Sequence, residues 1–206
     1  MVLKDRHRAL MAAAGGVLPP AYRRVDYIKS TNNAYIQTDY TPIIGDELSA
    51  DFMAESNANM ICLFSAGTGS SQLIALANKQ NTSSIKFYCK YFSTGSADSL
   101  NADNHINEWK RMTVSSDGTF TCNGISLRVT PTQALDGTAT TLRIFMRRDG
   151  SNPFIGRLKS FKVTNNGMVK INLIPCIRLS DSVAGAYDTV SKTFYSSASN
   201  NAFVAG

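Results

Sequence analysis

The chain has 206 residues, 43% of them hydrophobic, which is enough for the core of one large β domain or of one domain with an arm. Charged residues make up only 17%, and most of the net charge of +6 comes from residues 1–29, which hold six basic and two acidic side chains. Residues 30–206 are nearly balanced, so a basic face for nucleic acid is not indicated. No apolar run approaches the ~18 residues that span a membrane, so membrane insertion is not expected.

Residues 1–20 are interpreted as a basic N-terminal arm that carries a short helix. An apolar stripe at helical spacing runs along it: Leu3, His7, Leu10, Met11 and Ala14. Two glycines at 15–16 supply a stop, and two prolines at 19–20 prevent a restart. A helix this short is marginal alone in water, so we expect the arm to dock on a partner, with disorder as the alternative. The expected partner-binding residues are the stripe and its basic flank: Leu3, Lys4, Arg6, Arg8, Leu10 and Met11.

From residue 21 to residue 206 the pattern changes to β strands. Alternating or continuous apolar runs predict strands over 35–42, 47–55, 60–65, 72–77 and 85–92, and further strands within 109–129, 141–150, 156–175 and the closing segment. In the run 47–55 the alternation places one set of side chains on the inner face: Leu48, Ala50, Phe52 and Ala54.

Three dipeptides in the second half are typical of tight hairpin turns: Asp117-Gly118, Asn123-Gly124 and Asn166-Gly167. No convincing helix follows the arm. Many short strands with frequent turn signals indicate an all-β sandwich or barrel.

The four cysteines, Cys62, Cys89, Cys122 and Cys176, each lie inside an apolar, strand-like run. Their spacing fits no zinc pattern. We therefore expect four reduced, buried thiols that act as small hydrophobic side chains. A disulfide is the alternative if the protein matures outside the cell.

Both ends of the β region resemble a known family. The opening LPPAYRRVDYIKSTNNAYIQTDYTP, from Leu18, and the closing GAYDTVSKTFYSSASNNAFVAG, from Gly185, are similar to the first and last segments of concanavalin A-like, laminin-G-like jelly-roll domains. The strand INLIPCIR is also similar, with Leu173 where the family usually has Phe. The resemblance spans roughly residues 18–206 and implies a concanavalin A-like jelly-roll β-sandwich. Its first and last strands would share a sheet, with three aromatic side chains pointing into the core: Tyr187, Phe194 and Phe203.

Members of this family are abundant in virion proteins of gut bacteriophages and prophages, often behind a short basic segment that ends in Gly-Gly. The resemblance thus implies a non-enzymatic structural or accessory virion protein: a capsid decoration, head-fibre or tail-associated protein. It would assemble in the bacterial host cytoplasm, hold other virion proteins through its arm and form a homo-oligomer, expected to be a trimer. The alternative is a lectin-like tail or surface adhesin that binds host-cell glycan. The resemblance implies no cofactor.

Side chains suited to catalysis are few, and we expect no enzyme, no catalytic residue and no metal site. His105 lies in a polar loop without a nucleophile motif nearby. The carboxylates of Asp51 and Glu55 share a strand face, but the residue between them is Met53, so a glycosidase pair is incomplete. Asp188 is expected to form a turn. The loop acids Asp46, Glu47, Asp98 and Asp103 are interpreted as solvated, with a calcium site as the alternative.

A carbohydrate site is harder to exclude, because lectins of this architecture stack sugars on exposed aromatic rings. The candidate contributors are Trp109, Tyr88, Tyr91 and the polar loop 97–108. Trp109 begins a predicted strand, so burial in the core is the favoured expectation for it. None of these residues is assigned to a site from the sequence.

Overall fold

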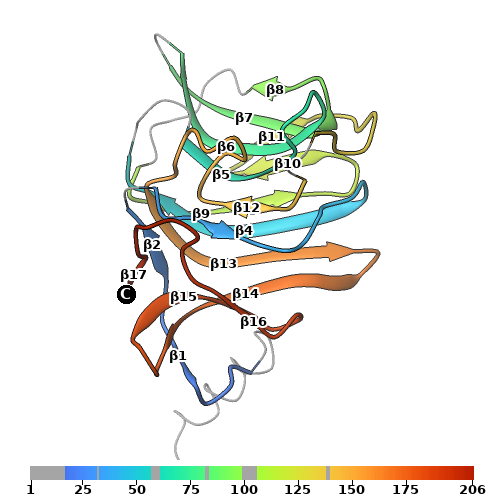
Figure 1. The fold of residues 1–206 in the computed structure, drawn as a ribbon. Helices are drawn as coiled ribbons and strands as arrows, with labels where there is room; N and C mark the ends of the chain where they lie inside the picture. Colours follow the sequence, from blue (N-terminus) through green and yellow to red (C-terminus); the bar gives the residue numbers. More distant parts are fainter. Residues whose placement is uncertain (1–16, 32, 57–60, 82–83, 99–105, 138–139) are drawn as a thin grey trace, which may run out of the picture.

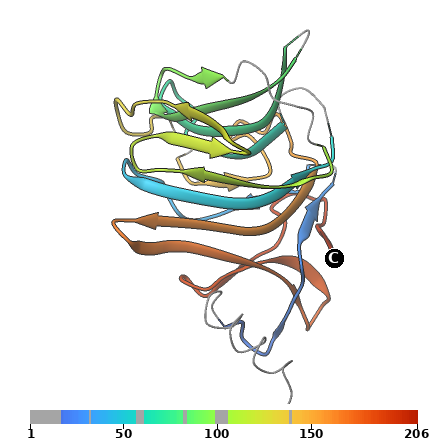
Figure 2. The ribbon, with the colours of Figure 1, turned by 180° about the vertical axis from the view of Figure 1, so that it is seen from behind.

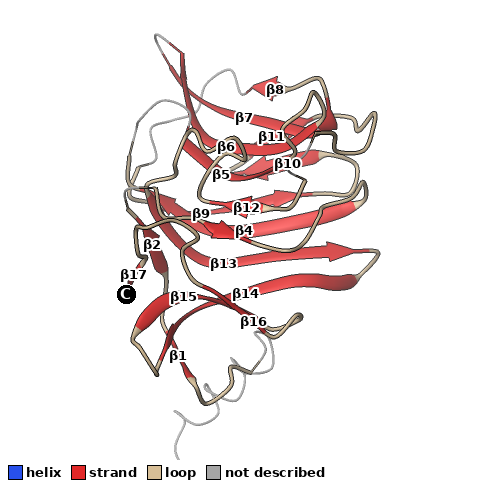
Figure 3. Ribbon diagram, in the orientation of Figure 1, coloured by secondary structure: helices blue, strands red, loops and turns tan. Residues whose placement is uncertain are grey.

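The computed structural model describes residues 17–206 except 32, 57–60, 82–83, 99–105 and 138–139. Within these ranges every regular element is a strand, and Figure 3 shows strands and loops only. No helix in the same ranges is long and apolar enough to cross a membrane. The predicted arm helix lies outside the described residues, together with the six residues expected to bind a partner: Leu3, Lys4, Arg6, Arg8, Leu10 and Met11.

The larger of two antiparallel sheets has eleven strands. They are β1 (Tyr22–Arg24), β2 (Ile28–Ser30), β4 (Asp46–Ala54), β9 (Trp109–Val114), β10 (Thr119–Cys122), β11 (Ile125–Arg128), β13 (Gly156–Asn165), β14 (Met168–Arg178), β15 (Val183–Asp188), β16 (Thr193–Tyr195) and β17 (Val204–Ala205). The main path runs β11-β10-β9-β4-β13-β14-β15-β16. Beside this path β1 pairs with β14, and β2 pairs with both β13 and β17.

The smaller sheet has six strands and packs against the larger one (Figure 1). Its strands are β3 (Ile36–Gln37), β5 (Ile61–Ala66), β6 (Gln72–Asn81), β7 (Ser84–Ser93), β8 (Ala97–Asp98) and β12 (Arg143–Ile144). Their order is β3-β12-β5-β6-β7-β8. An all-β fold with two antiparallel sheets is thus confirmed, and it is consistent with a jelly-roll sandwich.

The alternation predicted for β4 is confirmed, since Leu48, Ala50, Phe52 and Ala54 are all buried. The core lies between the two inner faces. For example, Phe64 of the smaller sheet meets Phe161 of the larger one edge to face, with the ring centroids 5.6 Å apart. Such contacts hold the two layers together through apolar burial.

The three predicted turns are present between the expected strands. Asn123-Gly124 joins β10 to β11 with φ angles of 49° and 77°, and Asn166-Gly167 joins β13 to β14 with φ angles of 48° and 75°. Positive φ at both central residues is the requirement of a type I′ hairpin, which Asn-Gly meets at low cost. The run 141–150 gives only a two-residue strand, because Phe145 has a φ of 75° and the chain turns there.

The two ends of the described chain share the larger sheet, as predicted. Val204 of β17 pairs with Lys29 of β2, and Figure 2 shows β2 beside the C-terminus. Phe203 is buried in the core as expected.

Tyr187 is buried as expected, with 4% of its surface exposed, but neither Tyr187 nor Phe194 belongs to the core cluster between the two sheets. Ala186 belongs to the core cluster, so strand alternation places Tyr187, the next residue, on the opposite face of the sheet. Phe194 is its cross-strand partner on the same face and is only half-buried. Tyr22 lies against both rings, with centroids 4.9 Å from Tyr187 and 5.3 Å from Phe194. These rings form an aromatic cluster of their own outside the sandwich core.

The prediction of four buried, unpaired thiols is confirmed: Cys62, Cys89, Cys122 and Cys176 are free and buried. They lie on four strands, two in each sheet.

Candidate functional site

A row of side chains crosses the outer face of the larger sheet at one end. The pairing register places Trp109 of β9 beside Met53 of β4, Met53 beside Arg157 of β13, and Arg157 beside Lys29 of β2. Their strand neighbours Phe52, Leu158 and Ile28 are fully buried in the core. Because side chains alternate along a strand, the row itself faces outward.

Six residues around this row form what we call the aromatic–cationic patch: Tyr27, Lys29, Glu55, Trp109, Arg157 and Lys159. The rings of Tyr27 and Trp109 lie 6.1 Å apart. The Lys159 ammonium lies 4.1 Å from the centre of the Trp109 ring, and the Arg157 guanidinium lies 4.5 Å from the centre of the Tyr27 ring. The patch therefore alternates aromatic rings with cations that stack on them.

Lys159 reaches Trp109 because β13 is irregular at that point. The register with β4 shifts between Leu158 and Ser160. Leu158 and Phe161 both belong to the core, so the extra residue leaves Lys159 exposed on the outside next to Ser160. A bulge of this kind re-aims side chains beside it.

Glu55 connects the two cations at the inner end of the patch. Its carboxylate pairs with the Lys29 ammonium at 2.5 Å and accepts a hydrogen bond from Arg157 Nε. Burial by itself would raise the pKa of Glu55, but the hydrogen bonds from Lys29 and Arg157 outweigh it and hold the pKa below its usual value. Glu55 is therefore an ionised residue that fixes the positions of the cations.

The sequence-based expectation that Trp109 is buried is wrong, since 37% of its surface is exposed. In the strand WKRMTV, Met112 and Val114 are buried. Lys110 lies on the same face of the strand and is also buried, with its ammonium 5.7 Å from the centre of the Phe87 ring. Because side chains alternate along a strand, Trp109 lies on the opposite face from these three residues. The alternation of Met112 and Val114 was the signal in the sequence that could have placed Trp109 outside.

The other two aromatic candidates are not part of the patch. Tyr91 is fully buried, and its hydroxyl donates a hydrogen bond to the Asp46 carbonyl at 2.9 Å. Tyr88 packs with Cys62 and Ile74 of the smaller sheet. The structure therefore does not bring Tyr88 and Tyr91 together with Trp109. Of loop 97–108, residues 99–105 lie outside the described part of the chain.

The acidic candidates have separate structural contacts. Asp46 was expected to be solvated but is fully buried, and its carboxylate accepts hydrogen bonds from the Tyr40 hydroxyl, the Ile43 amide and Asn165 Nδ2. Asp51 accepts a hydrogen bond from the Ser160 hydroxyl at 2.7 Å. Glu55 lies four positions further along the extended chain, roughly 13 Å from Cα to Cα, which is too far for a glycosidase pair. In the described ranges no three His, Cys, Asp or Glu side chains come together as a metal site. His7, Asp103 and His105 lie outside those ranges.

A polar hollow continues the outer face beyond Trp109. It lies over β4, β9 and β13, has a volume of about 290 Å³, and includes Ser49, Arg111, Thr113 and Lys162 in its lining. Arg111 lies two residues along β9 from Trp109 and so shares its face. An exposed aromatic ring beside hydroxyl, ammonium and guanidinium donors is the combination that holds a saccharide, whose rings are apolar on one face and whose hydroxyls need partners.

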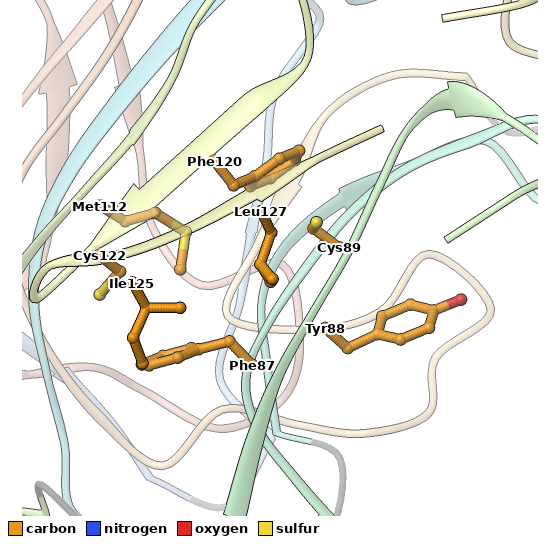
Figure 4. A pocket seen from close by; sticks show the side chains of 8 residues that line it. All are labelled: Phe87, Tyr88, Cys89, Met112, Phe120, Cys122, Ile125 and Leu127. Atoms are coloured by element: carbon orange, nitrogen blue, oxygen red, sulfur yellow. The ribbon is translucent and has the colours of Figure 1, made fainter. Parts of the chain in front are cut away.

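A second hollow is apolar and lies between the two sheets (Figure 4). It is lined by Phe87, Tyr88, Cys89, Met112, Phe120, Cys122, Ile125 and Leu127. Its volume of about 10 Å³ is room for a single water molecule. This slot is an imperfection of packing at the end of the core, too small for an organic ligand.

No protein family model matches this chain, and no curated protein matches it. Among solved structures the chain is similar to a native heptameric SAP-like pentraxin from Limulus polyphemus, with a TM-score of 0.46 and 10% sequence identity over 71% of this chain and 77% of that chain. No functional residue of this chain is inferred from that similarity.

Proposed function

We propose that this protein is a non-enzymatic binding module that holds carbohydrate on the outer face of its larger sheet, with Trp109 as the stacking surface. The observation that supports this most is the exposure of Trp109, the single tryptophan of the chain, among cations and beside a polar hollow. Lys159 lies over the ring on an exposed, flexible side chain, so a sugar can displace it and then accept a hydrogen bond from it.

The biological setting we propose rests on the resemblance of both chain ends to gut bacteriophage virion proteins. In that setting the module is an accessory virion protein, attached to other virion proteins through residues 1–20, and it presents the aromatic–cationic patch to host-cell glycan as an adhesin does. A purely structural role, as a capsid decoration or head-fibre protein, is the second candidate. The basic, apolar arm favours it, because such a segment suits a protein partner.

The single tryptophan makes the carbohydrate proposal directly measurable. Trp109 fluorescence should change in intensity or wavelength when a bound saccharide covers the ring, and a glycan array of bacterial surface polysaccharides supplies the candidates. Trp109→Ala should lower affinity at least tenfold, whereas Trp109→Phe, which keeps a stacking ring, should lower it less. Met168→Ala removes another exposed apolar side chain, at the start of β14 in the same sheet, and should leave binding unchanged. Equal binding by the wild type and Trp109→Ala, or no binding to any glycan, would overturn the proposal.

The structural candidate is tested on the particle. Deleting residues 1–17 should leave a folded β-sandwich, because all the described strands follow residue 21, but should abolish incorporation into virions. Phage that carry Trp109→Ala should assemble at normal copy number and adsorb poorly if the module is an adhesin. Normal adsorption of those particles would leave the structural role as the better account.

A further inference from the structure

The side chains on the outer face of the larger sheet continue in rows beyond Trp109. Strands β9, β4 and β13 lie side by side in that order (Figure 1). In the first row beyond Trp109, Asp51 of β4 lies opposite Arg111 of β9 and Ser160 of β13. The polar hollow begins beside this row and extends over the next.

The hollow exists because short side chains stand between long ones in the second row. Ser49 of β4 is the register partner of both Thr113 of β9 and Lys162 of β13. The serine and threonine side chains are short, whereas Arg111 and Lys162 carry long cationic side chains at two sides of the hollow. Thr113 lies four residues from Trp109, roughly 13 Å along an extended strand. A ligand that reaches from the Trp109 ring into the hollow is therefore longer than one monosaccharide.

The acidic side chains on this surface already have partners. Asp51 accepts a hydrogen bond from the Ser160 hydroxyl at 2.7 Å, and Glu47, which lines the hollow, accepts one from the Thr164 hydroxyl at 3.2 Å. Glu55 is paired with two cations in the patch. The patch, the first row and the hollow together carry five basic and three acidic side chains: Lys29, Arg111, Arg157, Lys159 and Lys162 against Glu47, Asp51 and Glu55.

The cations nearest to the hollow are not neutralised by these acids. Within the described residues neither Lys159 nor Lys162 forms an ion pair with a carboxylate, and the contact of Lys159 is the Trp109 ring. Arg111 is 68% exposed and lies 3.9 Å from Asp51. An ion pair this long on an exposed side chain contributes little, so the Arg111 guanidinium can turn toward a ligand at small cost.

We propose that the ligand of this surface is an acidic oligosaccharide, with one sugar ring stacked on Trp109 and the carboxylate or sulfate group of a further unit in the hollow between Arg111 and Lys162. This inference rests on the proposed function and deepens it by naming the charge of the saccharide. The arginine offers a planar fork of N–H donors to the anionic group, and the lysine offers a compact charge. The hydroxyls of Ser49 and Thr113 at the middle of the hollow can donate to its remaining oxygens.

The test compares each acidic polysaccharide with a neutral form of itself. Uronic acid units are reduced at the carboxyl to the primary alcohol, and sulfate esters are removed, while the sugar rings stay the same. We expect the wild type to bind at least one acidic polysaccharide about tenfold more tightly than its neutral form, because the charge-assisted contacts are lost with the acid group. Its affinity for the acidic form should fall as sodium chloride is raised. Loss of affinity on carboxyl reduction identifies a carboxylate ligand, and loss on desulfation a sulfated one.

The decisive variant is the double substitution Arg111→Gln and Lys162→Gln, which removes both charges beside the hollow. The ratio of the affinities for the acidic and the neutral form should fall close to one. The matched control is Lys90→Gln, which removes a charge on the other side of the sandwich. Lys90 lies between Cys89 and Tyr91, which belong to the core, so it faces outward from the smaller sheet, and its substitution should keep the wild-type ratio. The melting temperature of each variant checks that it is folded.

The outcomes separate this inference from the proposed function. Equal affinity for the acidic and neutral forms, with both lost in Trp109→Ala, would overturn the acidic ligand and leave carbohydrate binding in place. A wild-type affinity ratio in the folded double variant would likewise overturn the position given to the anionic group. Absence of binding to every polysaccharide, acidic or neutral, would overturn the proposed function itself.

Discussion

Asp188 stabilises the turn between β15 and β16 with four hydrogen bonds. Its carboxylate accepts from the backbone amides of Asn172, Val190 and Ser191 and from the Ser191 hydroxyl, at 2.7 to 3.2 Å, and the side chain is buried. Asp188→Ala leaves these partly buried donors without their acceptor, so we expect a loss of roughly 2 kcal/mol in the free energy of unfolding. Asp188→Asn should lose less, since one oxygen remains. Urea denaturation measures both, and an unchanged midpoint for the alanine variant would contradict this role.

Two phenylalanines near the C-terminus should differ sharply on truncation. Phe203 is buried in the core, with its ring 5.7 Å from that of Phe145, so Phe203→Ala should cost about 3–5 kcal/mol. Phe194 is half-buried on the opposite face, against Tyr22 and below the Arg178 guanidinium at 4.8 Å. Phe194→Ala should cost about 1–2 kcal/mol, because only part of the ring is withdrawn from water. Denaturant unfolding of the two variants side by side compares the two losses of unfolding free energy. Equal losses would show that Phe194 contributes as much as a core residue does.

At the scale of elements, Glu55 connects β2 to β13 beyond the end of β4, and this link should be sensitive to acid. A carboxyl whose pKa is lower in the folded than in the unfolded protein stabilises the fold fully above its unfolded pKa, and that contribution is lost as the pH falls through the folded pKa. The wild-type melting temperature should therefore fall as the pH drops below about 4.5.

Glu55→Gln should melt lower than the wild type at neutral pH and show a smaller further drop in acid, as measured by circular dichroism from pH 7 to pH 3. The control is Glu47→Gln, because Glu47 is exposed on β4 and hydrogen-bonds the Thr164 hydroxyl. This control should keep the wild-type acid dependence. Identical curves for Glu55→Gln and Glu47→Gln would show that the ion pairs with Lys29 and Arg157 add no stability.

The strands and turns that depend on a local sequence signal could be predicted from the sequence. The alternation of β4 and the Asn-Gly turns depend on neighbouring residues, and the structure has them where expected. The burial of Met112 and Val114 also indicates, from local alternation, that Trp109 lies on the outer face. The expectation that a tryptophan in a strand is buried pointed the other way and was wrong. The bulge that exposes Lys159 has no comparable signal, because it depends on how β13 pairs with β4.

At the scale of the whole molecule, the aromatic–cationic patch could not be assembled from the sequence. It takes side chains from β2, β9, β13 and adjoining segments. Register between strands so far apart is fixed by the packing of the complete core, which no local pattern specifies. The sequence could predict that two sheets form, but the strand order and the outward-facing rows came only with the structure.

The alkylation rates of the four cysteines test whether the two sheets unfold together. Cys62 of β5 and Cys89 of β7 lie in the smaller sheet, and Cys122 of β10 and Cys176 of β14 in the larger one. Burial raises the pKa of Cys62 and Cys89 to about 12 and of Cys122 and Cys176 to about 11. Only the thiolate attacks an alkylating reagent, so the folded protein should react slowly at all four positions.

If the sandwich unfolds as one unit, all four cysteines should be alkylated at the same rate under native conditions, because each must wait for the same global opening. In denaturant without reductant all four should react at once. Mass spectrometry of the alkylated peptides gives the rate at each position. Two or fewer reactive thiols after denaturation would reveal a disulfide. Faster native labelling of Cys89 and Cys122 alone, the two that line the apolar slot, would show that this end of the core opens independently of the rest.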